Sequence, residues 1–186
     1  TWMALVSGTE GIALATNSHY YLPEDVNYTG SGSAYIRGES TTKTACIHLN
    51  GHNLTSATRV IIGGSCTINV MGTGIVSGAY SAKDSTCGCT VMLNNKNDAA
   101  CINLFSGTFR QAEGVNENQY TVNAQGAGGT INIYEDALIE GNINGKALRV
   151  GHASLNNIAV NVYGATVDGD TYLVGAQDAS AYTVSV

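Results

Sequence analysis

Two acidic residues late in the chain could act as a general acid and a general base. Glu140 and Asp168 occupy nearly matching positions in two similar segments, and Asp170 follows closely. Paired carboxylates about 5–10 Å apart are the groups that hydrolyse glycosidic bonds. Both Glu140 and Asp168 are, however, followed directly by glycine, which is ordinary turn chemistry. The turn interpretation is favoured, and we assign no catalytic residue.

Residues that bind metals or nucleotides in other proteins lack the required spacing here. His48 and His52 lie four positions apart, but Gly51 breaks the helical face that a zinc site of the HExxH kind needs. Asp168 and Asp170 belong to no EF-hand or nonapeptide calcium motif. The Gly-rich stretch 126–129 does not open a helix, so it is a poor phosphate site. We therefore expect no metal and no cofactor.

A repeated pattern, an asparagine between two aliphatic residues, dominates the sequence. Apolar–polar alternation of this kind predicts short strands with one buried face. A further apolar residue follows six positions later, as Leu54, Ile75 and Phe109 show. The repeat units are centred on His48, Asn69, Asn103, Asn132, Asn161 and Ser185.

Each of five units contains a second apolar segment, followed by a connector rich in Gly and Asn. These segments span residues 59–62, 90–93, 120–123, 147–150 and 171–174. Repeats of this length without a helical period predict a solenoid of stacked strands. The asparagines would point outward and hydrogen-bond to one another as a ladder. One file of the shared core would contain Ile68, Ile102, Ile131 and Val160.

The two ends of the chain differ from the repeats. Thr1 could cap a short helix with Trp2 and Leu5 on one face, and such a helix would cover the open end of the core. Residues 19–30 then predict a first, imperfect strand. Val186 ends in mid-strand and would leave apolar edges exposed, so either more units follow or another subunit docks there.

Composition narrows the class of protein. The chain has a net charge of −6 and only 12% charged residues, so it has no basic surface for nucleic acid or an anionic membrane. No apolar run is long enough to span a bilayer, so we expect no membrane insertion. Two disulfides with one free thiol, or buried reduced thiols, are both compatible with the odd number of cysteines. These are Cys46, Cys66, Cys87, Cys89 and Cys101.

The stretches HYYLPEDVNYTG (19–30) and TACIHLNGHNLTSA (44–57) resemble the right-handed parallel β-helix repeats of secreted and cell-surface bacterial proteins, the pectate-lyase-like superfamily. The resemblance covers essentially the whole sequence. It implies an all-β, right-handed parallel β-helix of about six to seven rungs with a short N-terminal capping helix. It also implies a secreted or cell-surface location. The superfamily includes lyases, hydrolases, adhesins and inert spacers, and its catalytic pattern finds no matching positions here.

We expect a single domain over residues 1–186. The cap and the first rung would lie in 1–45 and the repeat rungs in 46–186, as a segment of a longer chain.

The best candidate binding surface is the outward face of the asparagine strands. Two positions after the asparagines come Met71, Phe105, Tyr134 and Tyr163, which would form an exterior column with a spacing of about 4.8 Å. Such rings could bind a polysaccharide, or they could simply stabilise neighbouring rungs, and the second interpretation is favoured. The candidate ligand-binding residues are Phe105, Tyr134, Tyr163, Asn103, Asn132 and Asn161.

These observations predict a non-catalytic extracellular module with a structural or adhesive function. It would associate end to end with a second copy through the open C-terminal rung, or bind a polysaccharide or host surface. The alternative is a polysaccharide-degrading enzyme, a glycoside hydrolase or lyase of the same superfamily.

Overall fold

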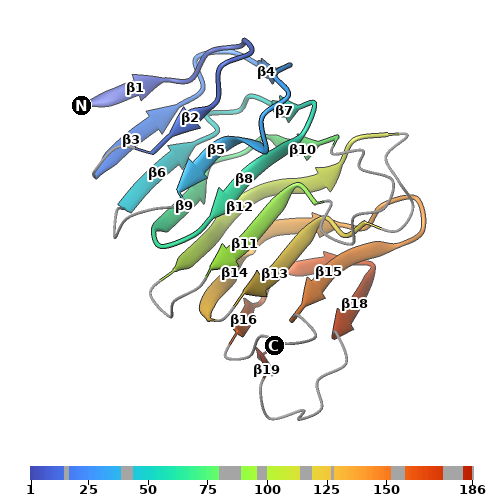
Figure 1. The fold of residues 1–186 in the computed structure, drawn as a ribbon. Helices are drawn as coiled ribbons and strands as arrows, with labels where there is room; N and C mark the ends of the chain where they lie inside the picture. Colours follow the sequence, from blue (N-terminus) through green and yellow to red (C-terminus); the bar gives the residue numbers. More distant parts are fainter. Residues whose placement is uncertain are drawn as a thin grey trace.

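The computed structural model describes residues 1–14, 17–38, 44–79, 89–95, 100–113, 119–126, 128–151, 158–173 and 182–185. Over these ranges the regular elements are all β-strands, and every pairing between them is parallel. The strands follow one another as a coil from one end of the molecule to the other (Figure 1). The predicted all-β solenoid is therefore confirmed.

The strands form three parallel stacks, because the larger of the two hydrogen-bonded sheets divides within its two long strands. The first stack contains β1 (Trp2–Ala4), β3 (Ser18–Tyr21), β6 (Thr44–His48), β9 (Thr67–Met71), the first halves of β12 (Cys101–Gln111) and β14 (Gly129–Glu140), β16 (Ile158–Tyr163) and β19 (Tyr182–Ser185). The second stack contains β4 (Val26–Tyr28), β7 (Leu54–Ser56), β10 (Ile75–Gly78), the second halves of β12 and β14, and β17 (Thr166–Asp168).

The third stack is the smaller sheet and runs along another side of the coil. Five of its strands overlap the second apolar segments predicted for the five units, although position 174 of the last segment lies outside the described residues. The strands of this stack are β2 (Ile12–Ala13), β5 (Ala34–Gly38), β8 (Arg59–Gly63), β11 (Val91–Asn95), β13 (Val122–Gly126), β15 (Lys146–Val150) and β18 (Asp170–Leu173).

Aliphatic side chains from successive strands form continuous files in the core. Ile68, Ile102, Ile131 and Val160 stand in register in the first stack, and all are fully buried. Burying each such side chain contributes roughly 1.5–3 kcal/mol, so the file is a main source of stability. The predicted common file is confirmed.

Tight corners connect the stacks. In the predicted LNGHNLT turn, Asn50 and Gly51 have φ values of 58° and 84°, a left-handed conformation that these two residue types tolerate best. The Asn50 amide also donates to the Leu22 carbonyl at 3.1 Å, which ties the corner to the preceding turn of the coil. In β12 the corner lies within the strand itself, at Gly107 with φ 103°.

The prediction of an N-terminal capping helix is wrong. Trp2–Ala4 form the strand β1, which pairs in parallel with His19–Tyr21 of β3. Pairing with β3 satisfies one side of the β1 backbone and lets Leu5 enter the core, where it is 1% exposed. An added strand therefore continues the coil where we expected a helical cover. No helix long and apolar enough to cross a membrane occurs in the described ranges.

Two register positions also differ from the prediction. Cys46, not His48, pairs with Asn69, and His48 pairs with Met71. In the second stack Val76 pairs with Phe109 as the buried residue, whereas Ile75 is only partly buried. Both shifts arise at corners, where the spacing between the two inward positions changes by one or two residues.

Candidate functional site

The outward face of the first stack carries an asparagine ladder, defined as Asn69, Asn103, Asn132 and Asn161. Nδ2 of each later asparagine donates to Oδ1 of the preceding one, at 2.7, 2.7 and 2.8 Å. At its N-terminal end, Nδ2 of Asn69 contacts the Cys46 sulfur at 3.5 Å. Strand alternation places these half-buried amides between two buried aliphatic files, so the predicted ladder is confirmed.

A column of rings runs beside the ladder. The rings of Phe105 and Tyr134 stack with centroids 4.5 Å apart, and those of Tyr134 and Tyr163 stack at 5.1 Å. Phe105 and Tyr163 are 37% and 50% exposed. We call these three residues the ring column. Phe105, Tyr134 and Tyr163 stack as predicted, whereas Met71, the fourth predicted member, pairs with His48 and is no part of this ring stack. Ligand binding by the six candidate residues stays a prediction.

The rings face one another along the coil, with interplanar angles of 15° and 23°. Both faces of the central ring, Tyr134, are therefore occupied by its neighbours. The outward side of the column therefore presents ring edges. This arrangement stabilises adjacent strands, which is the interpretation that the sequence favoured.

The outer side of the third stack is buried over much of its described length. Ile62, Met92, Asn123 and Arg149 follow one another in register there, and none is more than 8% exposed. Tyr172, in register with Arg149, is by contrast 49% exposed, and its ring stacks on Tyr120 with centroids 6.0 Å apart. The larger accessible surfaces of the described residues lie on the first and second stacks.

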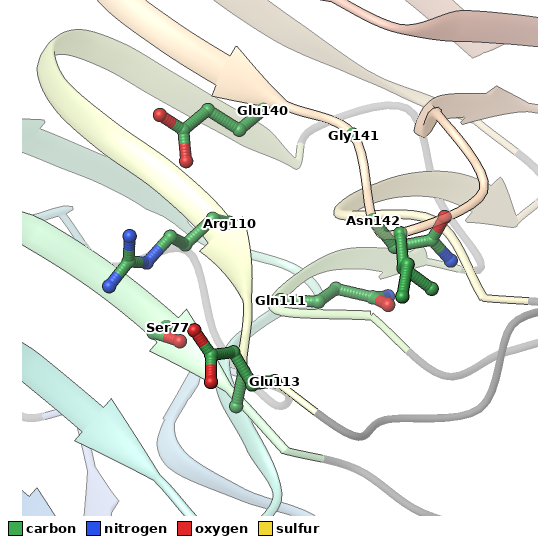
Figure 2. Close-up of a pocket in the computed structure, with 9 residues that line it drawn as sticks. Ser77, Arg110, Gln111, Glu113, Glu140, Gly141 and Asn142 are labelled. Carbon is green, nitrogen blue, oxygen red and sulfur yellow. The ribbon is translucent and has the colours of Figure 1, made fainter.

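A polar file runs along the outward face of the second stack and borders a hollow between β12 and the end of β14 (Figure 2). Ser77 pairs with Arg110, and Glu140 pairs with Asp168. The hollow, which we call the β12–β14 pocket, has a volume of about 650 Å³. Its lining consists of Ser77, Arg110, Gln111, Ala112, Glu113, Glu140, Gly141, Asn142 and Ile143.

Glu140 and Asp168, the two acids considered as catalytic candidates from the sequence, differ in their relation to this pocket. Glu140 lines it, whereas Asp168 is in register with Glu140 but does not. Asp168 precedes Gly169, whose φ is 140°, and its carbonyl accepts from the Gly141 amide at 2.7 Å. The structure thus gives both residues positions at a corner, as the turn interpretation predicted, and brings only Glu140 to the pocket.

Arg110, Gln111 and Glu113 were not singled out as site residues from the sequence. They belong to β12 and the residues just after it, and their relation to Glu140 depends on the register between β12 and β14. Alternation in the apolar residues around Phe109 was the available signal, because it places Arg110 on the outward face. No ion pair joins Arg110 to Glu113 or Glu140 in the described part of the chain.

Asp25 and His52 form a small polar cluster at a corner. His52 Nδ1 lies 3.6 Å from Asp25 Oδ1, and the Asn53 amide donates to the same oxygen at 2.8 Å. The hydrogen bond from the Asn53 amide, and the nearby His52, lower the pKa of Asp25. His52 thus contacts a carboxylate, and among the described residues no group of three His, Cys, Asp or Glu side chains could hold a metal ion.

In the described part of the chain, four of the five cysteines form no disulfide, which favours the reduced alternative for them. Cys66 and Cys89 are buried, and Cys46 and Cys101 are half-buried. Burial raises the pKa of the Cys66 and Cys101 thiols. Cys87 lies outside the described residues.

Comparison with family models, with curated proteins and with solved structures gave no significant match in any of the three. The functional argument therefore depends on the geometry of this chain.

Proposed function

We propose that this chain is a non-catalytic structural module of an extracellular protein, built to be a rigid rod. The observation that carries this proposal is the unbroken asparagine ladder, in which every amide from Asn103 to Asn161 donates to the preceding one. The ladder, the aliphatic files and the ring column all run along the coil. Each contact joins neighbouring turns, as in repeat proteins whose stability is a sum of nearest-neighbour terms.

The finer fold assignment is also part of the proposal. Parallel strands in three stacks agree with a right-handed β-helix of the pectate-lyase-like class, with about six to seven rungs. The right-handed sense is the usual one for crossover connections between parallel strands. A secreted or cell-surface location follows from that class.

The ring column is the surface that we propose for adhesion. The free edges of Phe105 and Tyr163, beside the ladder amides, give an amphipathic strip that suits a polysaccharide or host surface. End-to-end association with a second copy is a further adhesive mode, because β19 forms a pairing only with β16 among the described strands.

Single-molecule pulling tests the structural role. The module should resist extension as a stack and then release its turns in steps, and Asn132→Ala should lower the force at which the central turns detach. A chain that extends at low force without steps would contradict the proposal. So would product release from a polysaccharide panel that Glu140→Gln abolishes, since that result supports the enzyme alternative.

A carbohydrate array tests the adhesive surface separately. Binding should fall when Tyr163→Ala shortens the ring column. Tyr172→Ala changes an equally exposed tyrosine on β18, away from the column, and is the matched control. Equal losses in the two variants, or no binding at all, would remove the glycan-binding part of the proposal.

A further inference from the structure

The β12–β14 pocket has no role in a purely structural module, yet it combines a cation, carboxylates and a buried amide. We propose that it binds a small zwitterion, a molecule that carries both a primary ammonium group and a carboxylate, such as a free amino acid. This inference goes beyond the proposed structural function and does not depend on it.

Arg110 supplies the carboxylate-binding group. Its side chain is exposed and projects from β12 between the side chains of Glu140 and Glu113 (Figure 2). It forms no ion pair with the acids of the pocket. A guanidinium with free N–H groups binds a carboxylate through two parallel hydrogen bonds, which fixes the orientation of the ligand.

Glu140 and Glu113 supply acceptors for the ammonium group. Figure 2 shows their carboxylates on opposite sides of the Arg110 side chain, one from the end of β14 and one just after β12. With two carboxylates against one guanidinium, the lining retains a net negative charge that Arg110 alone does not neutralise. A zwitterion leaves that net charge unchanged, but its carboxylate can pair with Arg110 while its ammonium group pairs with the two acids, so each charged group of the ligand meets an opposite charge.

Gln111 is an independent sign of a missing donor. It is 8% exposed and lines the pocket, and its Nε2 donates to the Tyr120 carbonyl at 2.8 Å. Its Oε1 is buried without a hydrogen-bond partner. A buried acceptor without a partner is costly, and a donor that reaches this side of the pocket, beside Asn142, can remove that cost.

The remaining lining suits a ligand with a short apolar body. Ile143 on the rim is 88% exposed, and Ala112 forms part of the wall. A volume of about 650 Å³ accommodates an amino acid and lies within the usual range for small-molecule sites. We therefore use L-leucine as the probe.

The experiment titrates the whole chain with four probes and follows the backbone amide signals of Ser77, Arg110 and Glu140 by NMR. L-leucine carries both charges, acetate only the carboxylate, butylamine only the ammonium group, and glucose neither. Leucine should bind at least tenfold more tightly than each of the other three.

Variants then locate the site. Arg110→Gln and Glu140→Gln should each weaken leucine binding roughly tenfold or more, because each removes a charge-assisted contact. Arg110→Lys should weaken leucine binding less than Arg110→Gln, because lysine keeps the positive charge and loses only the paired N–H donors of the guanidinium. Asp168→Asn is the matched control, because Asp168 is the neighbour of Glu140 in register but does not line the pocket.

Several outcomes would overturn the proposal. Equal binding of acetate or butylamine would show a simple ion site, and preferential binding of glucose would show a sugar site. If Asp168→Asn weakened leucine binding as much as Glu140→Gln, the effect would come from the overall negative charge of the surface and not from a specific site. Absence of any shift at millimolar leucine would show that the pocket is an unoccupied surface hollow.

Discussion

Asn132 donates a hydrogen bond through Nδ2 to Oδ1 of Asn103 at 2.7 Å, across the paired strands β14 and β12. Its own Oδ1 accepts from Asn161. Each interior amide of the ladder thus acts as donor and acceptor at once. Removing one amide therefore leaves unsatisfied groups on the strands at both sides.

We expect Asn132→Ala to lower the free energy of unfolding by about 1–3 kcal/mol, since half-buried partners are left without hydrogen bonds. Chemical denaturation with detection by circular dichroism measures this change. Thr130→Ala is the control, because Thr130 precedes the ladder by two positions on the same outward face. Equal losses in the two variants would show that the ladder adds nothing to stability.

The core of the fold was predictable from sequence because alternation within a strand fixes which side chains point inward. Ile102, Asn103 and Leu104 keep this order in the structure, and so do Ile131, Asn132 and Ile133. The same rule failed at His48. The true unit there is Ala45, Cys46 and Ile47, and small Ala45 gave a weaker apolar signal than Leu49, which lies in the corner.

The candidate site was predictable only in part. The pairing of Glu140 with Asp168 follows from the repeat, because both stand at the same distance before a corner glycine. The approach of Arg110 to Glu140 does not follow in the same way. Leu104 pairs with Ile133 and Ser106 pairs with Asp136, so β14 has one more residue than β12 in this interval. This bulge could not be predicted from the sequence.

Substitution of a core residue by a charge should unfold the domain. Ile131→Asp or Ile133→Asp places an unpaired carboxylate in a fully buried file, at a cost of more than about 4 kcal/mol. Circular dichroism and thermal melting report the loss of structure. Asp136→Asn, on an exposed position of the same strand, should melt like the parent. A native-like melt of either Ile variant would contradict the inward assignment.

The ring column should contribute to stability in proportion to the number of ring contacts. Tyr134→Leu removes two stacked pairs and should cost about 1–3 kcal/mol, whereas Tyr163→Leu removes one and should cost about half as much. A double-mutant cycle on the two positions measures their coupling in chemical denaturation. Zero coupling would show that the two rings lie side by side without stabilising each other.

Thiol labelling should follow burial. Cys66 and Cys89 should resist alkylation in the native protein, and Cys46 should react before either of them. Cys101 should react slowly at neutral pH, because its raised pKa leaves little thiolate. Mass spectrometry of peptides from pulse-labelled protein locates the labels. The protein is also denatured and labelled without reductant. If even one of these four cysteines then stays unlabelled, it is held in a disulfide, and the assignment of reduced thiols is wrong.

The stability of the protein should fall in acid partly through Asp25. Because its pKa is lower in the folded chain than the ordinary value of 3.8, the charged form is favoured by folding. This contribution is complete above the ordinary pKa and is lost as the pH falls through the lower, folded value. Asp25→Asn keeps an oxygen acceptor for the Asn53 amide but cannot titrate, so its melting temperature should vary less with pH between about 4 and 2. Glu24→Gln, an exposed neighbour, should retain the steeper parental dependence. A flatter profile for Glu24→Gln, or an unchanged one for Asp25→Asn, would assign the acid sensitivity to other carboxylates.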